Sequence, residues 1–113
     1  MPRTANTYDT FTAIAEPKRR ELIEKLIGQE LSVNELVQKT QWSQPMVSKH
    51  LSVLKAAGLV TERRSGRHRF YSVRAEKLQP IQIWVRQFER HWIRQFDQLD
   101  EYLSEIQKKD EIR

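Results

Sequence analysis

The stretch SQPMVSKHLSVLKAAGLV constrains the fold more than any other, because it carries both a helix start signal and a helix stop signal. Ser43 is a good N-cap, and Pro45 lies in the first turn, where proline is tolerated. Gly58 suits the left-handed position that follows the end of a helix. The sequence therefore predicts a helix over residues 44–57 whose two ends are both fixed by local chemistry.

The outward face predicted for this helix is typical of a DNA-reading element. On a helical wheel with ~100° per residue, Val47, Leu51 and Leu54 form a core-facing stripe. The opposite face carries short polar side chains and one lysine, and no acid occurs from residue 44 to residue 61. Such a face can enter a major groove without a steric block; the alternative is a surface helix that happens to lack acids. The candidates for base contacts are Ser43, Gln44, Ser48, Lys49, His50 and Ser52, of which Gln44, Ser48 and Lys49 are the best placed.

A basic hairpin is predicted directly after this helix. Two strand-like runs, near 60–64 and 68–73, are separated by the tight-turn signal Ser65–Gly66. Residues 44–74 hold seven Lys and Arg residues against Glu62 alone, a net charge of +6, whereas the whole chain carries +5. A positive charge concentrated in this way can hold phosphates, although a merely solvated turn is the alternative. The hairpin candidates for DNA contacts are Arg63, Arg64, Arg67, His68 and Arg69.

Start and stop signals also place the preceding helices. A short helix is expected near the N-terminus, and a second one begins at Pro17 and stops at Gly28. Ser32 and Glu35 form the S-x-x-E pattern of a capping box, which predicts a third helix over 33–39. This helix and the DNA-reading helix are joined by a short turn, so the two together are expected to form a helix–turn–helix.

A long C-terminal helix is predicted to run from Pro80 to about Ile106, a length of ~40 Å at ~1.5 Å per residue. Apolar residues recur along it at every third or fourth position. A small domain covers only part of such a stripe, so we expect the remainder to pair with a second copy; packing within the chain is the alternative. The expected dimer contacts are Tyr8, Phe11, Trp84, Phe88, Trp92, Phe96, Leu99 and Leu103.

The order of helix, helix–turn–helix, basic hairpin and C-terminal helix resembles the ArsR-type (arsenic-repressor family) winged helix-turn-helix regulators. The segments that carry the resemblance are AIAEPKRRELIEKL (13–26), LSVNELVQKTQWSQPMVSKHLSVLKAAGLV (31–60) and RRSGRHRFYSV (63–73). The resemblance implies a homodimer that binds an inverted-repeat operator in double-stranded DNA and represses transcription. It also implies that the helix at 44–57 is the recognition helix and that the hairpin is the wing.

The expected fold class is mainly α with a small β-hairpin (α+β). A chain of 113 residues suits one domain, here with a winged helix–turn–helix core at 8–79, a dimerisation helix at 80–106 and a tail at 107–113. No apolar run approaches the ~18 residues of a membrane span, and no catalytic motif occurs, so neither a membrane protein nor an enzyme is expected. The absence of cysteine fits a reducing compartment, and a cytoplasmic location is expected.

The sequence departs from the metal-sensing members of the family. Those members carry a Cys-x-Cys element at the start of the third helix, where this chain has Ser32 and Asn34. Neither residue is a thiolate, so no soft-metal site is expected there. The C-terminal helix has one histidine, His91, without a partner at ligand spacing. We therefore predict a regulator that senses no metal and needs no cofactor, and whether a small-molecule effector exists is left open.

The three histidines are expected to have different roles. His50 lies at the edge of the core stripe, which favours a hydrogen-bonded structural role over a base contact. His68 is expected beside phosphate on the wing, and His91 is expected to be solvated.

Two other functions remain as alternatives to a DNA-binding regulator without an effector. The first is a protein-interaction module that uses the aromatic C-terminal helix. The second is a repressor that responds to a non-metal ligand.

Overall fold

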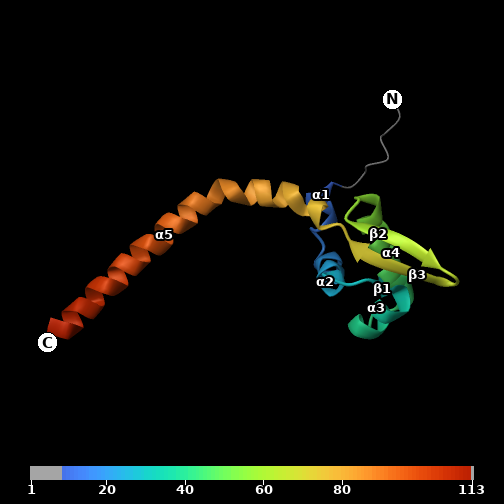
Figure 1. The fold of residues 1–113 in the computed structure, drawn as a ribbon, viewed down its shortest axis with the longest axis horizontal. Coiled ribbons are helices and arrows are strands. Elements are labelled where there is room, and N and C mark those ends of the chain that lie inside the picture. The colour runs from blue at the N-terminus through green and yellow to red at the C-terminus, as the bar shows by residue number, and fades with distance from the viewer. Residues whose placement is uncertain (1–8, 113) are drawn as a thin grey trace, which may run out of the picture. The chain divides into compact units, whose positions relative to one another are not determined.

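The structure, a computed structural model, describes residues 9–112 and divides the chain into two compact units, Met1–Pro80 and Ile81–Arg113. Figure 1 shows the elements of the first unit and the single helix that makes up the second. Their order is α1 (Thr10–Ala13), α2 (Pro17–Leu26), β1 (Leu31–Ser32), α3 (Val33–Thr40), α4 (Gln44–Ala56), β2 (Val60–Ser65), β3 (His68–Val73), η1 (Ala75–Leu78) and α5 (Gln79–Ile112). This is the mainly helical fold with a small antiparallel sheet that the sequence predicts.

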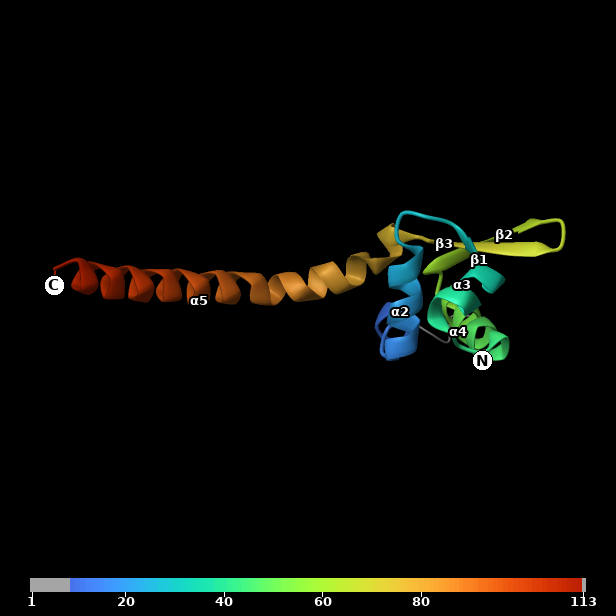
Figure 2. The ribbon, with the colours of Figure 1, turned by 90° about the horizontal axis from the view of Figure 1, so that it is seen from below.

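Three helices pack against one face of a three-stranded antiparallel sheet in the first unit. The strand order is β1-β3-β2, and Figure 2 shows α2, α3 and α4 on the same side of these strands. The predicted core stripe of α4, formed by Val47, Leu51 and Leu54, is fully buried. It meets Leu22 and Leu26 of α2 in one apolar cluster. Because α4 buries this face, its opposite face is held toward solvent.

Local chemistry fixes both ends of α4, as predicted. The Ser43 hydroxyl oxygen accepts a hydrogen bond from the Met46 N–H at 3.3 Å, which satisfies one of the free donors of the first turn. At the other end, Gly58 has a φ of 79°, and the Leu59 N–H donates to the Leu54 carbonyl at 2.9 Å. This is the hydrogen bond of a Schellman motif. The helix ends at Ala56, one residue before the predicted end.

The capping box predicted for α3 is also confirmed. The Glu35 N–H donates to the Ser32 hydroxyl at 3.1 Å, and the Ser32 N–H donates to the Glu35 carboxylate at 2.9 Å. The helix ends at Thr40, and the C-cap residue Gln41 has a φ of 62°, in the left-handed region. These caps fix where α3 begins and how the chain turns toward α4.

The sheet differs from the sequence prediction in two details. The two-residue strand β1 was not predicted, because Leu31 and Ser32 are too few to show an alternating pattern; they pair with Tyr71 and Phe70 of β3. The turn of the hairpin is shifted by one residue, because Ser65 pairs with His68. Its two central residues are therefore residues 66 and 67, and the glycine has a φ of 61°. A glycine with positive φ in the first central position is the pattern of a type II′ hairpin turn.

The second unit is the helix α5, which is longer than predicted. It has 34 residues and reaches Ile112, so the predicted tail at 107–113 is helical over nearly all of its length. Most of its large apolar side chains are between 40% and 65% exposed. These are Ile83, Trp84, Phe88, Trp92, Ile93, Phe96, Leu99, Tyr102, Leu103 and Ile106. No helix in the described part of the chain is long and apolar enough to cross a membrane.

Candidate nucleic-acid interface

The exposed face of α4 carries most of the predicted base-contact residues. Ser43, Gln44, Lys49 and Ser52 are exposed, and Ser48 is half-buried on the side of the helix near the wing. No hydrogen bond or ion pair within the described residues occupies the side chains of Gln44, Ser48 or Lys49, so their polar groups are available to a ligand. A recognition helix requires such an exposed, uncommitted set of donors and acceptors.

His50 differs from the other candidates because the structure places it in the core. Its side chain is only 7% exposed, so it is not in position to reach a base. The predicted structural role agrees with this burial, but the expected hydrogen bond to Nδ1 is missing among the described residues. Burial lowers the pKa of His50, and the nearby positive charges of Arg19 and Lys49 lower it further.

One predicted wing cation, Arg63, is neutralised within the chain. Its guanidinium donates to both carboxylate oxygens of Glu30, at distances between 2.8 and 3.2 Å, and lies 4.8 Å from the centre of the Phe70 ring. The hydrogen bond from Arg63 lowers the pKa of Glu30. Arg63, one of the five hairpin candidates for DNA contacts, therefore already has a carboxylate partner in Glu30, which lies 33 residues away in the sequence.

Glu62 neutralises a second part of the wing and connects it to α4. Its carboxylate accepts hydrogen bonds from Lys55 Nζ at 2.9 Å and from the Tyr71 hydroxyl at 3.0 Å. Arg69 Nε lies 3.7 Å from the same carboxylate. The Glu62 side chain is 10% exposed, and the hydrogen bonds from Lys55 and Tyr71 lower its pKa. Glu62 thus holds the last turn of α4 against the hairpin.

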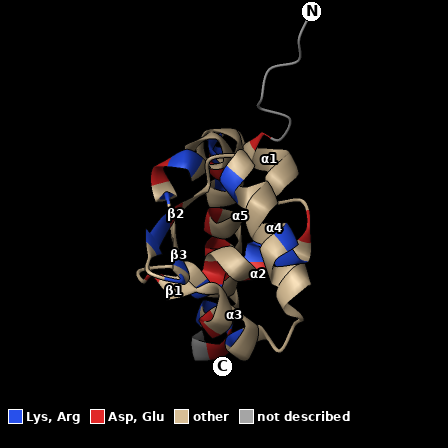
Figure 3. Ribbon diagram, turned by 90° about the vertical axis from the view of Figure 1, so that its right-hand side faces the viewer, with Lys and Arg blue, Asp and Glu red and all other residues tan. Residues whose placement is uncertain are grey.

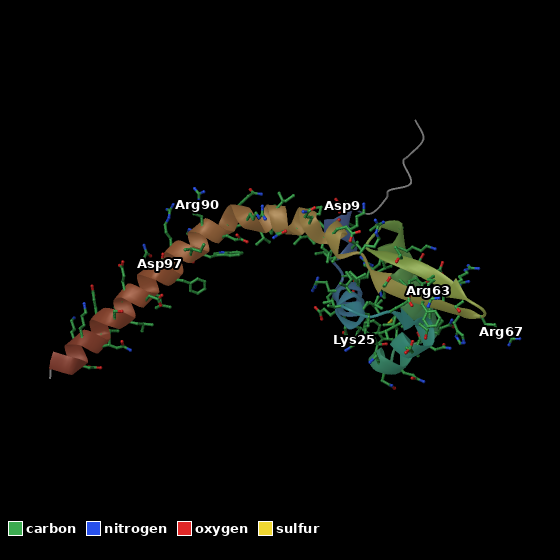
Figure 4. The ribbon with its side chains drawn as sticks, in the orientation of Figure 1. Asp9, Lys25, Arg63, Arg67, Arg90 and Asp97 are labelled. Atoms are coloured by element: carbon green, nitrogen blue, oxygen red, sulfur yellow. The ribbon has the colours of Figure 1, made fainter. Side chains whose placement is uncertain are left out.

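Several predicted DNA-contact residues, on the wing and on the recognition helix, have no carboxylate partner among the described residues. Within the described residues, no ion pair involves Arg64, Arg67, His68 or Lys49. Figure 3 shows Lys and Arg along β2 and β3, and Figure 4 shows Arg67 at the tip of the hairpin with Arg63 farther from it. Of the seven Lys and Arg residues in 44–74, four form ion pairs and three do not, so the sequence count overestimates the number of unpaired cations in this segment.

A surface hollow brings the wing tip and the recognition helix together. Its volume is about 330 Å³, and it is lined by Ser32, Val33, Asn34, Gln44, Ser48, Arg67, His68 and Arg69. Five of these residues were predicted as DNA contacts from separate parts of the sequence. The other three belong to β1 and the start of α3 and were not predicted to lie at the interface. The only sequence signal for them is the capping box, which fixes where α3 begins.

The start of α3 carries Ser32 and Asn34 at the two positions where the family resemblance would place the cysteines of a metal sensor. The Ser32 hydroxyl caps α3 by accepting from Glu35 N–H, and Asn34 is exposed. In the described part of the chain, no group of three or more His, Asp or Glu side chains is arranged to hold a metal ion. The chemistry of the residues supports the predicted absence of metal sensing, which stays a prediction.

The predicted dimer residues fall on both units. Phe11 of α1 is 42% exposed, whereas Ile14, just after α1, packs against the core. Trp84, Phe88, Trp92, Phe96, Leu99 and Leu103 are all exposed on α5. Tyr8 lies outside the described residues.

Comparisons with known proteins identify the family. The family described as bacterial regulatory protein, arsR family, matches residues 16–62, which run from the start of α2 into the first half of β2. The transcriptional repressor SdpR of Bacillus subtilis is 30% identical over 80 residues, covering 71% of this chain and 89% of SdpR. The transcriptional regulator HlyU of Vibrio vulnificus has a solved structure that aligns with a TM-score of 0.57 and 34% identity, over 67% of this chain and 79% of HlyU.

The chain belongs to the ArsR family of transcriptional regulators. The winged helix–turn–helix of this ArsR-family protein is therefore a DNA-binding domain, and its relatives are regulators rather than enzymes. The repressor SmtB of Mycobacterium tuberculosis is 43% identical over 63 residues, which are 56% of this chain and 47% of SmtB. This chain thus spans about half the length of SmtB.

Proposed function

We propose that this ArsR-family protein is a homodimeric repressor that binds an inverted-repeat operator and senses no metal. The observation that carries the proposal is the hollow that joins Gln44 and Ser48 of the recognition helix to Arg67 and His68 of the wing. Polar side chains that read base edges lie beside cations that hold phosphates, as sequence-specific DNA binding requires. SdpR and SmtB are both repressors, which supports repression as the direction of regulation.

The apolar stripe of α5 supports the homodimer. Phe88, Phe96 and Leu99 expose 40%, 65% and 50% of their surface, and they repeat at helical spacing on one long element. An exposed stripe of this kind is stabilised by a partner, and a second copy supplies an identical stripe. A twofold dimer would present two recognition helices to two half-sites about one helical turn, ~34 Å, apart.

Selection of bound fragments from random duplex DNA tests this function directly. We expect the selected fragments to contain an inverted repeat, and the protein to bind them in buffer treated with a chelator as tightly as in untreated buffer. Binding should weaken steeply as salt rises, because phosphate contacts release counterions. The absence of salt-sensitive binding to any duplex would instead favour the protein-interaction module.

Metal sensing is tested by adding metals to the selected complex. Zinc, nickel and arsenite should each leave the affinity unchanged, because Ser32 and Asn34 offer no thiolate at the start of α3. A metal that releases the DNA at micromolar concentration would contradict this part of the proposal.

A further inference from the structure

We propose that the hollow between the wing and the start of α3 is the seat of one DNA backbone phosphate, and that Asn34 is a DNA contact. This inference rests on the proposed function, because it assigns a particular contact within the same interface. It adds a third element, α3, to the recognition helix and the wing. Asn34 was not among the residues that the sequence marked for DNA binding.

The shape of the hollow fits a segment of nucleic-acid backbone. Its volume of about 330 Å³ is larger than a single phosphate group, and residues of the recognition helix form part of its lining. Three separate segments of the chain form its walls: the start of α3, the first turns of α4 and the tip of the hairpin. A backbone that follows the edge of a groove would pass between the wing and α4.

The charge of the hollow selects an anion. Arg67 and His68 line it and have no ion-pair partner among the described residues. Arg69 also lines it and shares Glu62 with Lys55 and Tyr71, so its charge is only partly compensated. No carboxylate lines the hollow. A group with several acceptor oxygens and negative charge, such as a phosphodiester, satisfies these donors.

The start of α3 adds neutral donors to the same wall. The capping box uses the N–H groups of Ser32 and Glu35, and the Glu35 carboxylate is held by the Ser32 N–H. The N–H groups of Val33 and Asn34 belong to the first turn, where no carbonyl within the helix can accept from them. The exposed Asn34 amide extends this set into the hollow. Cations on one wall and amide donors on the other are the combination that phosphate contacts use.

The decisive comparison is Asn34→Asp against Gln38→Glu. Each variant adds one negative charge to an exposed position of α3, but only residue 34 lines the hollow. Asn34→Asp should weaken binding to a selected duplex about tenfold at low salt, because its carboxylate would face the seated phosphate. Gln38→Glu should change the affinity for DNA by less than about threefold, since its charge lies outside the hollow and changes only the overall electrostatic potential of the protein.

Thermal unfolding without DNA separates binding from folding. An acidic residue in the first turn of a helix is stabilising, so Asn34→Asp should unfold at the same temperature as the wild type or at a higher one. A variant that binds DNA more weakly but folds at least as well has lost a contact rather than its structure. Equal loss of DNA affinity in the two variants would contradict the proposed phosphate site in the hollow while leaving the proposed function intact.

Neutral phosphate analogues locate the seat on the DNA. In a duplex scanned one position at a time with methylphosphonate, a neutral linkage at the seated phosphate should remove most of the Asn34→Asp penalty. If no single position in either half-site suppresses the penalty, the proposal is overturned. If the wild type binds no duplex at all, the proposed function fails instead.

Inorganic phosphate tests the other source of the same chemistry. Calorimetric titration of the free protein with inorganic phosphate should show no saturable binding in the millimolar range, because one free ion lacks the rest of the DNA contacts. The contrary result has two parts: inorganic phosphate binds saturably and Asn34→Asp abolishes this binding, and no methylphosphonate position suppresses the Asn34→Asp penalty. This result would assign the hollow to a small anion and contradict the proposed contact with a DNA phosphate.

Discussion

At the scale of single residues, the cations of the wing fall into two groups that the sequence does not distinguish. Arg63 is held by Glu30 and Phe70, whereas Arg67 at the tip has no carboxylate partner among the described residues. A cation that is already paired releases few counterions when DNA binds. The count of basic residues therefore overestimates the number of phosphate contacts that the wing can make.

The two groups predict different effects of alanine substitution. Arg67→Ala should weaken binding to all duplexes by a similar factor and reduce the salt slope of the affinity by about 1, because one phosphate contact is lost. Arg63→Ala is the control: it should change the salt slope less and have only a small effect on the free energy of unfolding, as for an exposed ion pair. Affinity measured at several salt concentrations checks both. Equal slopes for the two variants would contradict the distinction.

His50 predicts a dependence of stability on pH. The folded protein holds the pKa of His50 below its value of 6.5 in the unfolded chain, because the side chain is buried near positive charges. As the pH falls below about 6.5, the unfolded chain takes up a proton before the folded protein does, so the free energy of unfolding decreases. We expect His50→Leu to make this decrease between pH 7 and pH 5 shallower in denaturant titrations. Parallel curves for the wild type and the variant would contradict the prediction.

At the scale of elements, the recognition helix depends on its cap as well as its core. The Ser43 hydroxyl satisfies the Met46 N–H, and no other side chain among the described residues accepts from this donor. Ser43→Ala should therefore lower the free energy of unfolding by about 1 kcal/mol. Ser52→Ala, an exposed serine in the middle of the same helix, should leave it unchanged or raise it slightly, because alanine favours helix. The free energy of unfolding of both variants is measured without DNA, so that lost base contacts do not affect it. A larger decrease for Ser52→Ala than for Ser43→Ala would contradict the capping role of Ser43.

The ends of α4 could be predicted because the signals that fix them are local. A cap, a proline in the first turn and a glycine with positive φ act over three to five residues, so their effect is contained in the local sequence. The capping box of Ser32 and Glu35 was predicted for the same reason. The strand β1 was missed because its two residues are held by Tyr71 and Phe70, which lie about 40 positions later in the chain.

At the scale of the whole molecule, the apolar stripe of α5 predicts the oligomeric state. Leu99→Glu should shift the protein from dimer toward monomer, because it places a charge in the stripe that the second copy covers. Gln98→Glu adds the same charge next to it on a polar position and should leave the dimer intact. Sedimentation at several concentrations distinguishes the two species. A monomeric wild type would contradict the proposed homodimer, whereas two dimeric variants would place its interface elsewhere.

Dimerisation and DNA binding are expected to be linked. A dimer engages two half-sites at once, so loss of the second copy should weaken specific binding far more than non-specific binding. Leu99→Glu should therefore lower the affinity for an inverted repeat toward that for a single half-site. A variant that is monomeric yet binds the full operator as tightly as the wild type would show that symmetry contributes nothing.

The sequence by itself determined the main helices, the hairpin, the starts of α3 and α4 and the family, and it predicts most of the residues that line the hollow, because helix caps, turn glycines and apolar spacing are local signals. Tertiary structure alone decided which charges are free. Arg63 is paired with Glu30, 33 residues away in the sequence, and His50 is buried, although Arg63 and His50 were both predicted as DNA contacts. It also brought Asn34 beside the wing. Contacts between distant residues depend on how the elements pack, and no local pattern specifies that packing.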